Sequence, residues 1–104
     1  MTRIATLMYV NEGSYEEYKR RHDTLWPEMK QLLKDSGVYD YSIFLNEENG
    51  ELFAVLHVKD KKIYDNIAQD PVCQKWWEYM ADIMQVNEDN SPKAIELKEM
   101  FYLK

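Results

Sequence analysis

The clearest indication of the fold lies in residues 39–58, which read YDYSIFLNEENGELFAVLHV. Two β-prone segments, residues 39–46 and residues 51–58, alternate their side chains as strands do. Asn49 and Gly50 lie between them, and an Asn-Gly pair is typical of a tight hairpin turn. We therefore predict an antiparallel hairpin in the middle of the chain.

The alternation within this hairpin predicts two different sheet faces. In residues 39–46 one face is expected to carry Tyr39, Tyr41, Ile43 and Leu45, and the other Asp40, Ser42 and Phe44. In residues 51–58 the split is Leu52, Ala54, Leu56 and Val58 against Phe53 and Val55. Both faces are partly apolar, so a single helical layer leaves apolar surface uncovered. We expect a homodimer that packs sheet on sheet and buries the second face.

Before the hairpin, the sequence predicts a strand followed by a broken helix. Residues 3–10 are short, apolar and β-prone. Ser14 and Glu17 have the spacing of a capping box at a helix start. Pro27 interrupts the helix or restarts it, because its ring does not fit a regular helix interior. Gly37 is the expected C-terminal stop.

After the hairpin, two helix starts are marked by aspartates. Asp60 can cap a short helix that carries Ile63 and Ile67. Asp70 then supplies a cap directly before a proline, which predicts a longer helix over residues 71–84.

The chain closes with a polar loop over residues 87–92 and a predicted strand over residues 96–103. The order is then strand, helix, strand, strand, helix, strand. This order predicts one α+β domain over residues 1–104, with the ferredoxin-like βαββαβ arrangement and helices on one face of an antiparallel sheet.

Composition narrows the classes of partner. The 13 Lys and Arg residues are outnumbered by 19 Asp and Glu residues, for a formal net charge of −6. We therefore expect neither nucleic acid nor an anionic membrane as a partner. The single cysteine, Cys73, cannot form an internal disulfide. The N-terminal stretch lacks the features of a signal peptide, and no apolar run is long enough for a membrane helix, so a cytoplasmic protein is expected.

The predicted helix over residues 71–84 contains two adjacent tryptophans, Trp76 and Trp77. A projection at about 100° per residue puts Trp76 near the middle of the apolar stripe, together with Val72, Tyr79, Met80 and Ile83. Trp77 falls at the edge, beside Cys73 and Met84. The simple interpretation makes Trp76 a core residue and Trp77 a boundary residue. The functional one makes the indoles a stacking surface for a sugar.

The first predicted helix places Tyr18 and His22 on one face, because they are four residues apart. An inward histidine is more often a hydrogen-bonded core residue than a catalyst, yet its pKa suits proton transfer near neutral pH. Lys19, Arg20 and Arg21 are expected to form a solvated helix face.

Other site chemistries find little support in the sequence. The two histidines, His22 and His57, lack metal-ligand spacing, and Cys73 has no CxxC partner, so no metal or cofactor is expected. There is no glycine-rich phosphate loop and no nucleophile motif.

Five blocks, taken together, resemble the L-rhamnose mutarotase family from one end of the chain to the other. They are EEYKRRH at 16–22, LWPEM at 25–29, VCQKWWEYM at 72–80, DNSP at 89–92 and FYL at 101–103. The RRH…WPE and CQ-WW-YM patterns are specific in combination. The loop over residues 87–92 departs from the family pattern at Glu88, so the sequence does not decide whether this loop helps to close a pocket.

The resemblance implies a dimeric ferredoxin-like α+β barrel that interconverts the α and β anomers of L-rhamnose, a 6-deoxy sugar, in the cytosol without a cofactor. Position by position, His22 matches the proton donor, and Tyr18, Tyr41, Trp76 and Trp77 match residues that contact the sugar. The alternative is a non-catalytic ligand-binding protein, or a haem- or quinone-linked one, on the same dimeric fold, because fold alone does not decide function.

Overall fold

The computed structural model describes residues 2–104 and contains one four-stranded antiparallel sheet. The strands are β1 (Thr2–Tyr9), β2 (Val38–Asn46), β3 (Glu51–Val58) and β4 (Ile95–Leu97), in the spatial order β2-β3-β1-β4. All three pairings are antiparallel. This order confirms the predicted α+β class, and it is the one expected of the ferredoxin-like arrangement. The dimeric barrel concerns a second chain and stays a prediction.

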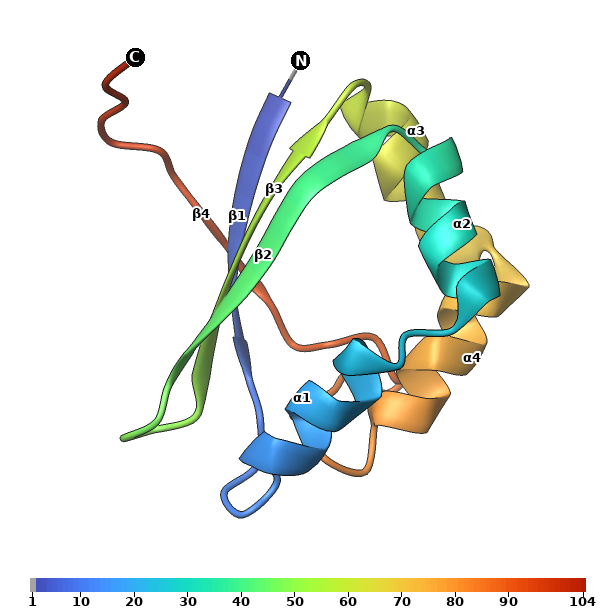
Figure 1. The fold of residues 1–104 in the computed structure, drawn as a ribbon, viewed down its shortest axis with the longest axis vertical. Coiled ribbons are helices and arrows are strands. Elements are labelled where there is room, and N and C mark those ends of the chain that lie inside the picture. Colours follow the sequence, from blue (N-terminus) through green and yellow to red (C-terminus); the bar gives the residue numbers. More distant parts are fainter. Residues whose placement is uncertain (1) are drawn as a thin grey trace.

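The helices all lie on one side of the sheet (Figure 1). They are α1 (Tyr15–Asp23), α2 (Pro27–Asp35), α3 (Lys61–Asp65), the 3-10 turn η1 (Asn66–Gln69) and α4 (Pro71–Met80). Each of the two crossovers therefore contains more than one helix, as the sequence predicts. The first is divided at Pro27, and the second has separate helices that begin after Asp60 and Asp70. None of the helices within residues 2–104 has both the length and the apolar character needed to cross a membrane.

Both predicted aspartate caps are confirmed. Asp60 Oδ1 accepts a hydrogen bond from the Lys62 backbone N–H at 2.9 Å. Asp70 Oδ1 accepts one from the Val72 backbone N–H at 2.8 Å. Each carboxylate satisfies an N–H group that the first helical turn leaves without a partner, so both helix starts follow from local sequence.

The predicted capping box at the start of α1 is wrong. The Ser14 side chain makes no cap hydrogen bond. Glu17 turns instead to Arg20 and Arg21, with contacts of 2.6–2.8 Å to their guanidinium groups. Charge-assisted hydrogen bonds are stronger than the neutral bond to a backbone N–H, so the carboxylate is drawn away from the cap.

The hairpin is confirmed, with one irregularity in β2. Its register shifts by one residue between Tyr39 and Ser42, where Asp40 adopts a positive φ of 51°. This bulge turns Tyr39 to the side of the sheet without helices, where its ring centroid lies 5.2 Å from that of His57. Tyr41 stays on the helix side. The expectation that Tyr39 and Tyr41 share a face is therefore wrong, because a bulge breaks strict alternation.

The helix side of β3 is the centre of the core. Leu52, Ala54, Leu56 and Val58 alternate along it and are almost completely buried, as the sequence predicts. Two clusters share this face of the sheet, one under α1, α2 and α4 and a smaller one around Ile4 and Val38.

The last predicted helix is shorter than expected, and its buried face differs from the one that the projection gave. It ends at Met80 rather than residue 84, and Met84 instead forms a bridge with Val10. Cys73, placed at the stripe's edge by projection, is only 2% exposed, whereas Tyr79, placed in the stripe, is 37% exposed. The face of α4 that is buried depends on where the sheet and α2 lie, and a projection of a single helix contains no information about them.

The last strand is also shorter than predicted. β4 has three residues, and residues 98–104 of the described chain form no helix or strand. Met100, Phe101 and Leu103 are largely exposed there. Within the described sheet β4 lies at the edge, beside β1, so it has few backbone partners to extend it.

The side of the sheet without helices carries a continuous apolar row. Phe44 pairs with Phe53, Phe53 with Leu7, and Leu7 with Ile95, so the row crosses all four strands. Phe44 is 61% exposed and Ile95 54% exposed. The predicted apolar character of this second face is confirmed for the single chain.

The turn at Gly50 generates a testable prediction about stability. Gly50 has φ of +77°, and a Cβ there would lie 2.5 Å from the Val10 carbonyl oxygen. Gly13 has a similar φ of +85° but open space around it. We expect Gly13→Ala to lower the free energy of unfolding by about 1–2 kcal/mol through backbone strain alone. Gly50→Ala should lower it by at least about 1 kcal/mol more, since the contact with Val10 must also be relieved.

Denaturant unfolding of both variants beside the wild type measures this difference. Equal losses for the two variants would mean that the Val10–Gly50 contact relaxes freely and does not constrain the hairpin.

Candidate functional site

A cavity of about 820 Å³ lies between the helix side of the sheet and the layer of helices. It falls within the range of about 300–1,000 Å³ that is usual for small-molecule sites. All five residues singled out from the sequence line it: His22, Tyr18, Tyr41, Trp76 and Trp77. They come from α1, β2 and α4, which are distant in the chain. The structure therefore brings the predicted site residues together in one place.

His22 lies in the last turn of α1 and is held by Tyr18 in two ways. Its Nδ1 lies 3.0 Å from the Tyr18 carbonyl oxygen. A carbonyl only accepts hydrogen bonds, so Nδ1 carries the proton and donates it. The two rings are also stacked, with centroids 4.3 Å apart. In the neutral ring this arrangement leaves Nε2 as the nitrogen that can exchange a proton with a ligand.

The surroundings of His22 favour the neutral imidazole. Burial lowers its pKa below the ordinary histidine value, against the weaker opposing effects of the hydrogen bond to Tyr18 and the charge of Asp23. Desolvation disfavours the charged form of any buried base. At neutral pH the ring is therefore mostly uncharged, and its imidazolium form is a stronger acid than an exposed histidine.

Tyr18 and Tyr41, the two cavity tyrosines singled out from the sequence, remain protonated at neutral pH. Burial raises the pKa of Tyr18 well above the ordinary tyrosine value. The pKa of Tyr41 is also strongly raised, mainly by burial. Although Tyr41 is 40% exposed, it lines the cavity, and we attribute the exposed area to its cavity side. The protein around the phenol still removes much of its water, which raises the pKa. Both phenols can donate and accept hydrogen bonds there.

The adjacent tryptophans of α4 lie in different surroundings, as the sequence predicts. Trp76 is buried, with its ring edge-on to His22 at 5.4 Å and to Trp26 at 5.1 Å between centroids. Trp77 is half-buried and also lines the cavity. Edge-to-face contacts of this kind are favourable aromatic geometries. Trp76 thus joins α4 to α1 and α2, while Trp77 keeps more surface free.

The structure adds cavity residues that the sequence did not indicate. Tyr64 of α3 lines the cavity, whereas the neighbouring Ile63 is 54% exposed. Cys73 lines it as well, and burial raises the pKa of its thiol to about 11, so it stays protonated at neutral pH. A five-residue helix is too short for its periodicity to show which face turns inward, so no sequence signal distinguished Tyr64.

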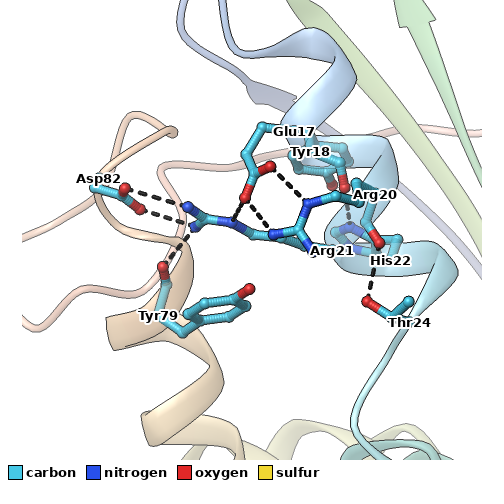
Figure 2. A network of polar contacts seen from close by, with 8 residues as sticks. All are labelled: Glu17, Tyr18, Arg20, Arg21, His22, Thr24, Tyr79 and Asp82. Atoms are coloured by element: carbon cyan, nitrogen blue, oxygen red, sulfur yellow. Dashed lines mark hydrogen bonds and ion pairs between the residues drawn. The ribbon is translucent and has the colours of Figure 1, made fainter.

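One basic residue of α1 also departs from expectation. Arg21 is only 8% exposed, although it was expected on a solvated face with Lys19 and Arg20. It forms a bidentate ion pair with Asp82, just beyond α4, as Figure 2 shows. The sequence contains no local signal for this pair, because 61 residues separate its members.

The arrangement suits proton transfer to a small polar ligand held between aromatic rings. His22 supplies an exchangeable nitrogen, the tyrosines supply hydroxyl groups, and the indoles supply flat apolar faces with N–H groups at their edges. Within residues 2–104 there is no group of three His, Cys, Asp or Glu side chains placed to hold a metal ion.

The fold recurs in a protein of very different sequence. The structure of a Mycobacterium tuberculosis protein matches this chain with a TM-score of 0.58 at 9% sequence identity, over 99% of this chain and 100% of the other. At this identity the likeness concerns the fold alone, and it lends no support to the alternative function.

Other comparisons are much stronger. A family model described as L-rhamnose mutarotase matches residues 3–103. L-rhamnose mutarotases from Listeria monocytogenes serotype 4b and Bacillus subtilis are 58% and 52% identical to this chain over 103 residues, with 99% of each chain covered. The crystal structure of an L-rhamnose mutarotase from Formosa agariphila matches with a TM-score of 0.94 at 51% identity, over 100% of both chains. By sequence along nearly its whole length, this chain belongs to the L-rhamnose mutarotase family.

Proposed function

We propose that this protein interconverts the α and β anomers of L-rhamnose by acid/base-assisted opening and reclosing of the pyranose ring. The observation that carries the proposal is the state of His22, whose Nδ1 is engaged by the Tyr18 carbonyl while its ring lines an aromatic-walled cavity. Family membership supports L-rhamnose as the substrate, and this geometry supports His22 as the group that moves a proton.

Anomer exchange requires two proton movements and no change of oxidation state. In ring opening, the ring oxygen gains a proton, the anomeric hydroxyl loses one, and the bond between C1 and the ring oxygen breaks to leave an aldehyde. Rotation about the C1–C2 bond presents the other face of the carbonyl, and the reverse transfers close the ring. A positioned acid/base typically accelerates such a step by about 10²–10⁴-fold.

We assign His22 to the ring oxygen. This oxygen occupies the same place in both anomers, whereas the anomeric hydroxyl changes its position. One fixed group can therefore serve both directions at the ring oxygen: the imidazolium form of His22 donates the Nε2 proton on opening, and the neutral ring, whose Nε2 then carries no proton, takes it back on closing. The second proton passes through Tyr18, water or a backbone group, and Tyr18 stacks directly on the imidazole.

The aromatic residues are assigned to sugar binding. Trp76, Trp77, Tyr18 and Tyr41 surround the cavity from α4, α1 and β2. Indole faces suit the C–H side of a pyranose, and the two phenols suit its hydroxyl groups. The C6 methyl of a 6-deoxy sugar fits the apolar side chains that fill the remaining wall, such as Met80 and Leu52.

We also propose that two copies pair through the side of the sheet without helices. The apolar row from Phe44 to Ile95 is continuous across all four strands, unlike the scattered apolar residues of an ordinary monomer surface. Self-association of that surface would bury it in both copies at once. The exposed apolar side chains of residues 100–103 lie just beyond β4 and would add to it. A cytoplasmic location, expected from the sequence, stays a prediction.

The central prediction concerns His22→Ala. The wild-type protein should accelerate optical equilibration of freshly dissolved L-rhamnose, followed by polarimetry, or exchange between its anomers followed by saturation-difference NMR. The variant should fold and bind the sugar, because the aromatic surface is unchanged, but its exchange rate should fall by about 10²–10⁴-fold. Near-normal exchange in the folded variant would transfer the proton-donor role to Tyr18.

The pH dependence tests the direction of the transfer. Burial places the pKa of His22 below the ordinary histidine value, so the imidazolium fraction falls as pH rises through that lowered pKa. If the imidazolium donates the proton, kcat falls with rising pH over this range, and the dependence disappears in His22→Ala. A kcat that rises over the same range would make neutral His22 a base for the anomeric hydroxyl.

A further prediction separates the two tryptophans. Trp77→Ala should weaken L-rhamnose binding by about 5- to 30-fold, equivalent to about 1–2 kcal/mol of lost contact, while changing stability less. Trp76→Ala should in addition destabilise the fold by about 3–5 kcal/mol, since its ring is buried among other aromatics. Titration calorimetry and thermal unfolding of both variants measure this. Unchanged affinity with a large stability loss in Trp77→Ala would make Trp77 a core residue only.

The dimer is tested by changing the exposed apolar row. Wild-type protein should sediment as a dimer at micromolar concentration, and Phe44→Asp should shift it toward monomer, because a charge buried in the interface is unfavourable. Ile63→Asp is the matched control, since Ile63 is similarly exposed but lies in the helix layer. A wild-type monomer, or equal disruption by both variants, would contradict this interface.

A further inference from the structure

Arg21 is the most deeply buried charged residue of α1 and directly precedes His22 in the chain. Neighbours on a helix point about 100° apart, so the two side chains leave the helix in different directions. His22 turns into the cavity, and Arg21 turns toward the end of α4. A cation that is only 8% exposed needs partners, and the structure provides several.

The guanidinium group of Arg21 uses three of its nitrogens across two helices (Figure 2). Nη1 and Nη2 donate to the two carboxylate oxygens of Asp82 at 2.9 and 3.2 Å. Nη1 also donates to the Tyr79 carbonyl oxygen at 2.7 Å, and Nε donates to Glu17 Oε2 at 2.7 Å. The guanidinium carbon lies 4.4 Å from the centroid of the Tyr79 ring.

These contacts suit arginine and the place where they occur. The Tyr79 carbonyl belongs to the last turn of α4, where carbonyl groups lack intrahelical partners and positive charge is favoured. The planar fork of arginine can pair with a carboxylate through two nitrogens while other N–H groups bind elsewhere. Lysine, with one ammonium group on a flexible chain, cannot reproduce this set at once. The arginine hydrogen bonds hold the pKa values of Glu17 and Asp82 low, so both carboxylates stay charged at neutral pH.

The contacts bear on the site because of what lies next to them. Trp76 is one turn before Met80 on α4, and its ring meets both the Tyr79 ring, at 5.6 Å, and the His22 ring, at 5.4 Å between centroids. His22 and Trp76 belong to different helices, so their separation depends on how α1 and α4 are held together. Arg21 is the residue directly before His22 on α1. Its partner on α4, the Tyr79 carbonyl group, is three residues after Trp76.

We propose that Arg21 is a positioning residue for catalysis, which fixes His22 of α1 against the tryptophans of α4 by clamping α1 to the C-terminal end of α4. The inference rests on the proposed role of His22. Arg21 touches neither the sugar nor the proton in transit. A displacement of about 1 Å in a catalytic group can lower the rate by about 10²-fold, so a small change in helix placement is sufficient to matter.

The competing explanation is that Arg21 only stabilises the fold. Other contacts also join these regions, including the Asn11 backbone N–H that donates to the Ile83 carbonyl oxygen at 2.8 Å. If Arg21 is purely structural, its substitution lowers thermal stability and leaves the turnover of each folded molecule unchanged. If Arg21 is a positioning residue, its substitution lowers kcat in the folded protein and leaves the sugar affinity nearly constant, because the aromatic surface is still present.

The test uses the full-length protein with Arg21→Lys, Arg21→Met and Asp82→Asn, and with Arg20→Lys as the matched control. Arg20 bears the same group one position earlier, and its guanidinium group pairs with Glu17 of its own helix. Its contact with α4 is to the Tyr79 side chain and not to Asp82 or the Tyr79 carbonyl oxygen, and Arg20→Lys keeps the positive charge there. Asp82 is mostly exposed, so Asp82→Asn and Arg21→Lys still test the clamp if Arg21→Met does not fold. Three quantities are measured: the L-rhamnose Kd, kcat for anomer exchange per folded molecule, and the NMR shifts of the histidine ring protons.

We expect kcat to fall by about 10- to 100-fold in Arg21→Met and by a smaller factor in Arg21→Lys and Asp82→Asn, with Kd within about threefold of wild type. The ring protons of His22 should shift as the contact with Trp76 of α4 loosens, whereas the stacking on Tyr18, within α1, should persist. His57, on the other side of the sheet, serves as internal reference. Arg20→Lys should leave kcat and both histidine spectra unchanged.

Wild-type kcat per folded molecule in the Arg21 variants, or unchanged His22 shifts in them, would overturn the proposal. The NMR shifts do not depend on turnover, so they test the clamp even if the wild-type protein fails to exchange rhamnose anomers. In that case the proposed function fails by itself, and the spectra still decide between a clamp and a purely structural arginine.

Discussion

The alternation of side chains along β3 divides the molecule into a closed side and an open side. Leu52, Ala54, Leu56 and Val58 point to one side and are almost completely buried beneath the helices. Phe53 points to the other side and belongs to the exposed apolar row. A strand has a side-chain period of two, so one segment can supply both the floor of a cavity and an association surface. The site and the proposed dimer contact are thus opposite faces of one sheet.

The helices remain apart from the sheet where the cavity lies, and contacts among their own side chains hold them there. Trp76 lies at the centre of an aromatic cluster with His22 and Trp26, which joins three helices without filling the space below them. On the outer side of α1, the buried Arg21 pairs with Asp82. The aromatic contacts shape the wall of the site, and the directional ion pair sets how the helices lie along one another. Burial of an unpaired arginine would be strongly unfavourable, which gives this arrangement its specificity.

The same architecture does not imply the same chemistry. The Mycobacterium tuberculosis protein shares this fold at 9% sequence identity, whereas the Formosa agariphila L-rhamnose mutarotase shares it at 51%. A cavity above an antiparallel sheet is a feature of the layout and can hold many ligands. The hydrogen bond from His22 Nδ1 to Tyr18 and the adjacent tryptophans are features of the side chains and not of the layout. They carry the functional proposal, because function depends on the groups placed in the cavity and not on the layers around it.

The sequence alone determined the features that depend on nearby residues. Asn49-Gly50 predicted the hairpin, Asp60 and Asp70 predicted helix starts, and the four-residue spacing of Tyr18 and His22 predicted their contact, since each rests on local geometry. The family resemblance also pointed to five of the residues that line the cavity. The pairing of Glu17 with Arg20 and Arg21 in place of its helix cap is also local, since all three belong to α1. Tertiary structure decided the rest: the bulge that turns Tyr39 away from Tyr41, and the burial of Arg21. These depend on partners in other elements, such as Asp82, 61 residues from Arg21. Such contacts form only when the chain has folded, so no pattern of neighbouring residues predicts them.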